Sequence, residues 1–342
     1  MASTYAAEVV VVVGHGPVAG SLAASWTGMG ATVRSVDALP PQDAQSELAG
    51  ASVVVLVGHA GEMAAAGTRG AAERHKAIVA HTQRTLAAAR AVGVRHLVAI
   101  SSAAVHGAWP DRPQIHDDDA VAAFDEASRG GLVGDLLAME AVLERGARRA
   151  SPRITILRPA ALAGVGIDTF VTRHFEAPRL LMVRGATRQW QFVHVEDLAA
   201  ATRFVVQHGL TGPLTVGADD LLEPDEVERA AGMRRIELAA TTAFGTAERL
   251  HRVGVLPSPA AELAFVVYPW SVASDGLRAA GWTTRWSSAQ CLDVLLEGVQ
   301  GRVAVAGRRL GTRDAAIGAA GAAVAFVGTA AVWRQARARR RR

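Results

Sequence analysis

Three glycines with the spacing of a nucleotide-binding turn follow the first apolar run of the sequence. The segment GHGPVAG places Gly14, Gly16 and Gly20 directly after a run of valines and before a helix-like stretch. Small residues let the backbone turn tightly and approach a pyrophosphate, and a helix N-terminus offers free N–H groups to that anion. The segment therefore predicts a dinucleotide-binding turn, with a purely structural strand–turn–helix corner as the alternative.

The turn can be read in two registers, and an acidic residue follows it at a meaningful distance. Residues 14–19 satisfy the pattern G-x-G-x-x-A, whereas a GxxGxxG pattern would have Pro17 in place of its middle glycine. Asp37 follows the second apolar run, 23 positions after Gly14. This is close to the spacing of about 20 residues expected for a carboxylate that bonds the ribose hydroxyls. Because such a carboxylate repels a 2′-phosphate, NAD is favoured over NADP.

Groups that could move protons lie further along the chain. Ser102 is followed four positions later by His106, whose imidazole titrates near neutral pH. For His106 the alternative is a packing or capping role in a loop. The IHDDD segment, residues 115–119, puts a histidine beside three carboxylates, which we expect to solvate a loop and favour a helix N-terminus. We expect no metal site there, and Cys291, the only cysteine, cannot form a disulfide within the chain.

Apolar runs of strand length alternate with longer helix-like stretches over the first 200 residues. Continuous Val, Ile and Leu runs indicate strands covered on both faces, as in a parallel sheet between helices. The alternation predicts an α/β fold with a doubly wound parallel sheet. The predicted strands are 8–14, 31–36, 51–58, 95–102, 153–159 and, after the pattern loosens, 212–218.

The length and composition suit a well-packed globular protein. The chain has 342 residues, 50% of them hydrophobic, which is enough for one large or two interlocked domains. We divide it into a dinucleotide-binding core at 1–160 and a mixed region at 161–307. The mixed region completes the sheet near 190–218 and forms a small substrate subdomain. An apolar helix and an Arg-rich tail occupy 308–342.

The positive charge of the protein belongs to that tail. The last nine residues hold six arginines, so their removal changes the net charge from 36 − 32 = +4 to 30 − 32 = −2. We therefore expect no nucleic-acid binding by the body. Residues 315–333 carry no charge and nearly reach the length of about 20 residues that spans a bilayer. We predict a cytoplasmic protein associated with an anionic membrane surface through residues 315–342, with an Ala-rich helix packed on the body as the alternative.

Taken together, these motifs resemble the extended short-chain dehydrogenase/reductases, the NAD-dependent epimerase/dehydratase family. The likeness covers residues 8–300 and rests on GHGPVAG, VVVLVGHAG, GVRHLVAISSAAVHG, ILRPAALAG and WQFVHVEDLAAA, in that order. The resemblance implies a Rossmann-type parallel sheet of seven strands, a small C-terminal substrate region, NAD as cofactor, a small-molecule substrate and a homodimer.

Carried over position by position, the resemblance implies roles for ten residues. Ser102 matches the family's catalytic serine, and His106 stands where the family usually has a tyrosine; these two are the candidate catalytic residues. The candidate cofactor-binding residues are Gly14, Gly16, Val18 and Gly20 at the pyrophosphate, Asp37 at the adenosine ribose, Gly58 beside the dinucleotide, and Ser101 and Pro159 near the nicotinamide.

The family's Tyr-x-x-x-Lys pair is the main departure, because it falls on Leu132 and Leu136. No change of register restores it, since Lys76 is the only lysine and Tyr268 the only tyrosine beyond residue 5. In that pair the tyrosine transfers the proton, while the ammonium group lowers the tyrosine pKa and holds the ribose. Leucine can do neither.

Three functions are compatible with these departures. The first is an atypical NAD-binding, epimerase/dehydratase-like protein that, if catalytic, acts on a sugar nucleotide or another small hydroxyl or carbonyl substrate through non-standard groups. The alternative is a catalytically silent NAD-binding sensor or scaffold, with or without a membrane tether. A third reading is a scaffold that binds no nucleotide, because Pro17 and Ile78 obstruct the cofactor. Arg173, Arg179 and Arg184 lie where relatives place substrate-binding groups, and they form either an anion-binding group or a solvated face.

Overall fold

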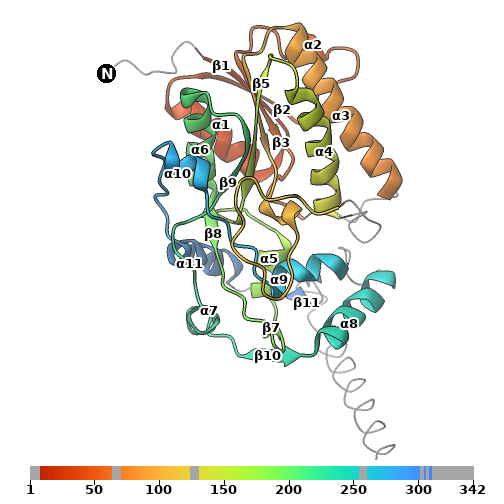
Figure 1. Ribbon diagram of the computed structural model, residues 1–342, viewed down its shortest axis with the longest axis vertical. Helices are drawn as coiled ribbons and strands as arrows, with labels where there is room; N and C mark the ends of the chain where they lie inside the picture. Colours follow the sequence, from red (N-terminus) through yellow and green to blue (C-terminus); the bar gives the residue numbers. More distant parts are fainter. Residues whose placement is uncertain are drawn as a thin grey trace, which may run out of the picture.

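The computed structural model describes residues 8–63, 71–123, 131–253 and 260–300, and two short strands beyond them. Its centre is a six-stranded parallel sheet with the strand order β2-β1-β3-β4-β5-β9 (Figure 1). The predicted α/β fold with a parallel sheet is confirmed. The strands are β1 (Val9–Val13), β2 (Thr32–Val36), β3 (Val53–Val57), β4 (His96–Ile100), β5 (Arg153–Pro159) and β9 (Gly212–Val216).

Helices cover both faces of this sheet. Helices α1 and α6 pack against each other on one face, and α3 and α4 pack together on the other (Figure 1). The valines of β1 from Val10 to Val13 are fully buried, because helices cover the strand from both sides. The helices are α1 (Gly16–Gly28), α2 (Ala44–Glu47), α3 (Ala71–Ala91), α4 (Leu132–Ala147) and α6 (Val195–His208), with a 3-10 helix η1 (Ala103–His106) after β4.

A smaller part, in the lower half of Figure 1, is built from segments after β5. Its strands form separate two-stranded parallel pairs, β6 with β8 and β7 with β10. The strands are β6 (Ala161–Ala163), β7 (Leu180–Val183), β8 (Phe192–His194) and β10 (Arg235–Leu238). The helices are α5 (Phe170–Phe175), α7 (Pro224–Ala231), α8 (Ala240–Arg252), η2 (Ala260–Leu263), α9 (Ala264–Val267) and α11 (Ser288–Val299), followed by the short strands β11 (Ala304–Val305) and β12 (Arg308–Arg309). The short helix α10 (Asp275–Ala279) lies instead beside β9 of the central sheet (Figure 1).

The expectation of seven strands in the central sheet was wrong. This sheet has six strands among the described residues, because β8 pairs with β6 instead of joining it.

The predicted apolar helix at 315–333 and the Arg-rich segment after it lie outside the described residues. Within the described part of the chain, no helix combines the length and the apolar character needed to cross a membrane.

Candidate nucleotide-binding site

The glycine turn connects β1 to α1 and depends on its glycines. Gly14 and Gly16 have φ values of 136° and 84°, which side chains rarely adopt. A Cβ on Gly14 would lie 2.7 Å from the Cβ of Val57, and one on Gly16 would lie 2.8 Å from the carbonyl oxygen of Ala60. Pro17 lies in the first turn of α1, where its missing N–H costs little. The close approach of the β3 loop therefore requires glycine here, whether or not a ligand binds.

A carboxylate from the loop after β3 lies against this turn. The backbone N–H of Val18 donates to the carbonyl oxygen of Ala60 at 3.2 Å. The carboxyl carbon of Glu62 is 3.2 Å from the position that a Cβ on Gly16 would occupy, and Oε2 of Glu62 is 3.8 Å from Nδ1 of His15. The N-terminus of α1 thus has an acidic side chain beside it, at an end of the helix that attracts anions.

The adenosine side of the turn is open. Asp37 directly follows β2, the strand that pairs with β1, and its side chain is exposed. Gly20 is exposed as well, and a Cβ there would meet no atom within 4 Å. An exposed carboxylate beside a glycine turn and a helix N-terminus fits a ribose and a pyrophosphate. The residues of this half therefore fit the adenosine end of NAD.

The expected nicotinamide end is packed with apolar side chains. Leu136, to which the resemblance assigns the family's lysine position, is 1% exposed, and Leu132, to which it assigns the tyrosine position, is half-buried. A Cβ on Gly58 would lie 2.6 Å from Sδ of the buried Met139. Met139 of α4 therefore packs closely against Gly58, directly after β3.

A closed polar network lies beside these apolar residues. Ser101 donates its hydroxyl hydrogen to Oε1 of Glu140, and Nη2 of Arg158 donates to Oε2 of Glu140 at 2.6 Å. Nη1 of Arg158 is 3.2 Å from Nε2 of His106. All four side chains are at most 2% exposed. The charges of Glu140 and Arg158 balance each other, as buried charges must.

The two candidate catalytic residues are both buried after β4. His106 has Nδ1 at 3.1 Å from the carbonyl oxygen of Ala120 and Nε2 bonded to Arg158, so both ring nitrogens are engaged. Burial, reinforced by the charge of Arg158, lowers the pKa of His106 to about 4, so its ring is neutral near pH 7. Ser102 caps η1 by accepting the N–H of Ala104 at 3.2 Å. Their catalytic role stays a prediction.

The predicted site residues gather at one edge of the sheet. Each lies at or after the carboxyl end of one of the strands β1 to β5, which are neighbours in the sheet. Sequence reasoning missed Glu62, Glu140 and Arg158 as site residues. A signal existed for the latter two, because each is the one charged residue in an otherwise apolar stretch of a buried helix or strand.

The sequence of this chain matches a known family. The model of the NAD dependent epimerase/dehydratase family matches residues 9–217. The chain belongs to this family. The resemblance noted from the sequence is thereby confirmed, and NAD is the cofactor on which the family depends.

Solved structures with the same fold include enzymes of sugar nucleotides. UDP-N-acetylglucosamine 4-epimerase from Bacillus cereus is 15% identical, with a TM-score of 0.58 over 86% of this chain and 100% of that one. The dTDP-glucose 4,6-dehydratase from Bacillus anthracis, in complex with NAD, is 9% identical, with a TM-score of 0.62 over 86% of this chain and 97% of that one. At these identities the similarity shows the fold alone.

Curated relatives match a smaller part of the chain. Uncharacterized proteins of Mycobacterium tuberculosis and Mycobacterium bovis are 28% identical over 144 residues, which is 42% of this chain and 38% of theirs. The matched segment thus spans well under half of the length of these relatives.

Proposed function

We propose that this protein binds NAD at the carboxyl ends of β1 and β2 and acts as a NAD-responsive binding protein. In this proposal it does not perform the tyrosine- and lysine-dependent hydride transfer of its family. The observation that carries the proposal is the packing of Leu136, 1% exposed, at the position where the family has its lysine. No side chain rearrangement turns that position into a proton-transfer group, since leucine has no titratable atom.

The residues that would hold NAD are the ones predicted from the sequence. Asp37 would accept hydrogen bonds from the adenosine ribose, and its exposure supports this role. Gly14, Gly16, Val18 and Gly20 would border the pyrophosphate at the N-terminus of α1. Gly58, Ser101 and Pro159 would lie towards the nicotinamide, which supplies a hydride-accepting ring when NAD is bound.

In this proposal, the polar groups nearest to the nicotinamide end stabilise the fold and do not transfer protons. Ser101 is bonded to Glu140, and His106 is neutral and bonded on both nitrogens. A general acid or base needs a free position within reach of substrate and a pKa near the working pH. His106 has neither in this arrangement, which supports binding without proton transfer.

A second candidate function is catalysis on a sugar nucleotide or another small hydroxyl or carbonyl substrate. Ser102 favours it, because its hydroxyl accepts one hydrogen bond from Ala104 while its own hydrogen meets no acceptor among the described residues. That hydrogen could be donated to a substrate oxygen. The family membership of the chain supports this substrate class.

The two candidate functions differ in whether the protein converts a substrate into a product. The full chain would be incubated with NAD and a panel of UDP- and dTDP-sugars, and the products would be separated by chromatography, with NADH followed by absorbance. The binding proposal predicts no product above the protein-free control. Product formation that is lost in Ser102→Ala would overturn it in favour of catalysis.

The membrane association of residues 315–342 is a separate proposal that rests on the sequence alone. An apolar, small-residue segment followed by six arginines suits the surface of an anionic bilayer. Flotation of the full chain with vesicles, with and without phosphatidylserine, tests it against a chain that ends at residue 313. Equal partitioning of both chains would contradict it.

A further inference from the structure

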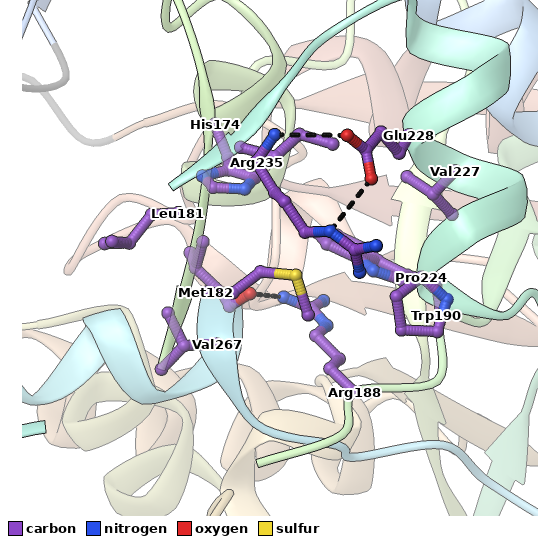
Figure 2. A pocket seen from close by; sticks show the side chains of 12 residues that line it. His174, Leu181, Met182, Arg188, Trp190, Pro224, Val227, Glu228, Arg235 and Val267 are labelled. Carbon is purple, nitrogen blue, oxygen red and sulfur yellow. Dashed lines mark hydrogen bonds and ion pairs between the residues drawn. The ribbon is translucent and has the colours of Figure 1, made fainter. Parts of the chain in front are cut away.

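A small cavity lies in the part of the protein away from the glycine turn, between α5, β7, α7, β10 and α9 (Figure 2). Its volume is about 20 Å³, slightly more than the 10–15 Å³ or so that one water molecule needs. Most of its wall is apolar, including Leu180, Val227 and Val267. Figure 2 shows the side chain of Arg188 reaching into this apolar surrounding.

Arg188 is a buried cation without a counter-ion among the described residues. Its side chain is 3% exposed, and its guanidinium carbon lies 3.3 Å from the ring centre of Trp190. Nη1 donates to the backbone oxygen of Val266. Nε is buried and meets no acceptor in the described part of the chain, and Nη2 forms no hydrogen bond with the described residues. A neutral carbonyl and an aromatic face stabilise a guanidinium less than a carboxylate does.

The titratable groups around the cavity do not supply the missing charge. Glu228 has both oxygens directed at Arg235, one towards its side chain at 3.1 Å and one towards its backbone N–H at 3.4 Å (Figure 2). Asp225 also pairs with Arg235, at 3.0 Å. Burial, together with the nearby charge of Arg188, lowers the pKa of His174 to about 3, so this ring is neutral. The cation of Arg188 is therefore left unbalanced.

We propose that this cavity binds the carboxylate group of a small ligand, with Arg188 as its counter-ion. Nε and Nη2 lie on one edge of the guanidinium group, so they offer two parallel donors to the two oxygens of a carboxylate. The small volume limits the ligand to the smallest carboxylates, of which formate is the simplest, and excludes a sugar nucleotide from this position. The site is separate from the glycine turn, and the inference does not depend on NAD binding.

The charge of the ligand can be tested on the unaltered full chain. Thermal unfolding and calorimetry would compare formate with formamide, which has the shape of formate without its charge, at constant ionic strength set with chloride. Formate is expected to raise the melting temperature in a saturable way, and formamide is not. An equal response to formate and formamide, or no response to formate beyond that to chloride, would overturn the proposal. So would a saturable response to inorganic phosphate in place of carboxylates.

The residue can be tested with a matched pair of variants. Arg188→Gln removes the buried charge, whereas Arg229→Gln removes an exposed arginine of α7. Arg188→Gln is expected to weaken carboxylate binding at least about tenfold, and Arg229→Gln to leave it unchanged. Carboxylate affinity that survives in Arg188→Gln, or that falls equally in both variants, would show that Arg188 is not the counter-ion.

Discussion

Two halves of the same sheet edge differ in what they leave accessible. At β1 and β2, Asp37 is exposed and Gly20 borders open space. At β4, β5 and α4, Glu140 and Arg158 bond each other and Leu136 is buried. The first half, the open half, keeps groups that a nucleotide can reach. The second half, the closed half, has its polar groups bonded within the protein.

The two halves are built from separate elements of the fold. The turn after β1 and the carboxylate after β2 are positioned by backbone geometry and by their strands. The buried residues of the second half come from α4, β5 and the segment after β4. Under the function proposed above, NAD binding in the first half therefore does not require proton transfer in the second.

The largest effect is expected from breaking the buried pair in the closed half. Glu140→Ala leaves Arg158 buried without its partner, which is expected to lower the free energy of unfolding by about 3–5 kcal/mol. Glu144→Ala is the matched control, because Glu144 is 54% exposed and lies 3.8 Å from the same arginine; its effect is expected to stay below about 1 kcal/mol. Urea unfolding measures both. Equal losses of unfolding free energy in the two variants would show that the buried pair of Glu140 and Arg158 does not stabilise the closed half.

A somewhat smaller effect concerns acid stability. His106 has its pKa lowered from 6.5 to about 4 in the folded protein. The unfolded chain therefore binds the extra proton first, so stability is present above pH 6.5 and is lost as the pH falls towards 4. The loss assigned to this group is about 3 kcal/mol at most, and His106→Gln is expected to remove that part of the pH dependence.

His116 is the control for this pH experiment, because its pKa is shifted in the opposite direction. Its hydrogen bond with Asp275 raises the pKa, so its contribution is present at low pH and is lost as the pH rises. His116→Asn is therefore expected to leave the acid-induced loss in place. Unfolding curves between pH 7 and pH 4 measure how the stability of each variant depends on pH. Identical pH dependence for the wild type and His106→Gln would contradict the buried, neutral state of the His106 ring.

The smallest effect is expected in the open half, at Glu62. Its carboxylate lies beside the N-terminus of α1, where the pyrophosphate of NAD would add negative charge. Glu62→Gln is expected to strengthen NAD binding about two- to fivefold, whereas Glu73→Gln, which changes an exposed acid on α3, is expected to leave it unchanged. Weaker binding in Glu62→Gln would mean that this carboxylate assists the ligand.

The sheet was predictable because its strands are continuous apolar runs. Val10–Val13 and Val53–Val57 have no alternating pattern, and strands of that kind are buried on both faces. The prediction of a seventh strand in the central sheet was wrong, because strand pairing depends on partners far along the chain. Phe192–His194 pairs with Ala161–Ala163, and neither segment reveals that choice in its own residues.

Local spacing is enough to propose Gly14, Gly16 and Asp37, because they depend on one turn and one strand, and their binding role stays a prediction. The pairing of Glu140 with Arg158 and the isolation of Arg188 depend on how distant helices and strands pack. A single charge in an apolar stretch indicates that Glu140 and Arg158 are buried, but it does not identify their partners. The carboxylate at Glu62 was missed for the same reason, since a loop after one strand lies on the turn after another.

The most direct test of the open half is a calorimetric titration of the full chain with NAD and with NADP. We expect that NAD binds, that NADP binds more weakly, and that Asp37→Ala weakens NAD binding at least about tenfold. Asp43→Ala, which changes an exposed acid without a side-chain capping bond, should bind NAD as the wild type does. Absence of NAD binding, or equal affinity in Asp37→Ala and the wild type, would contradict the account.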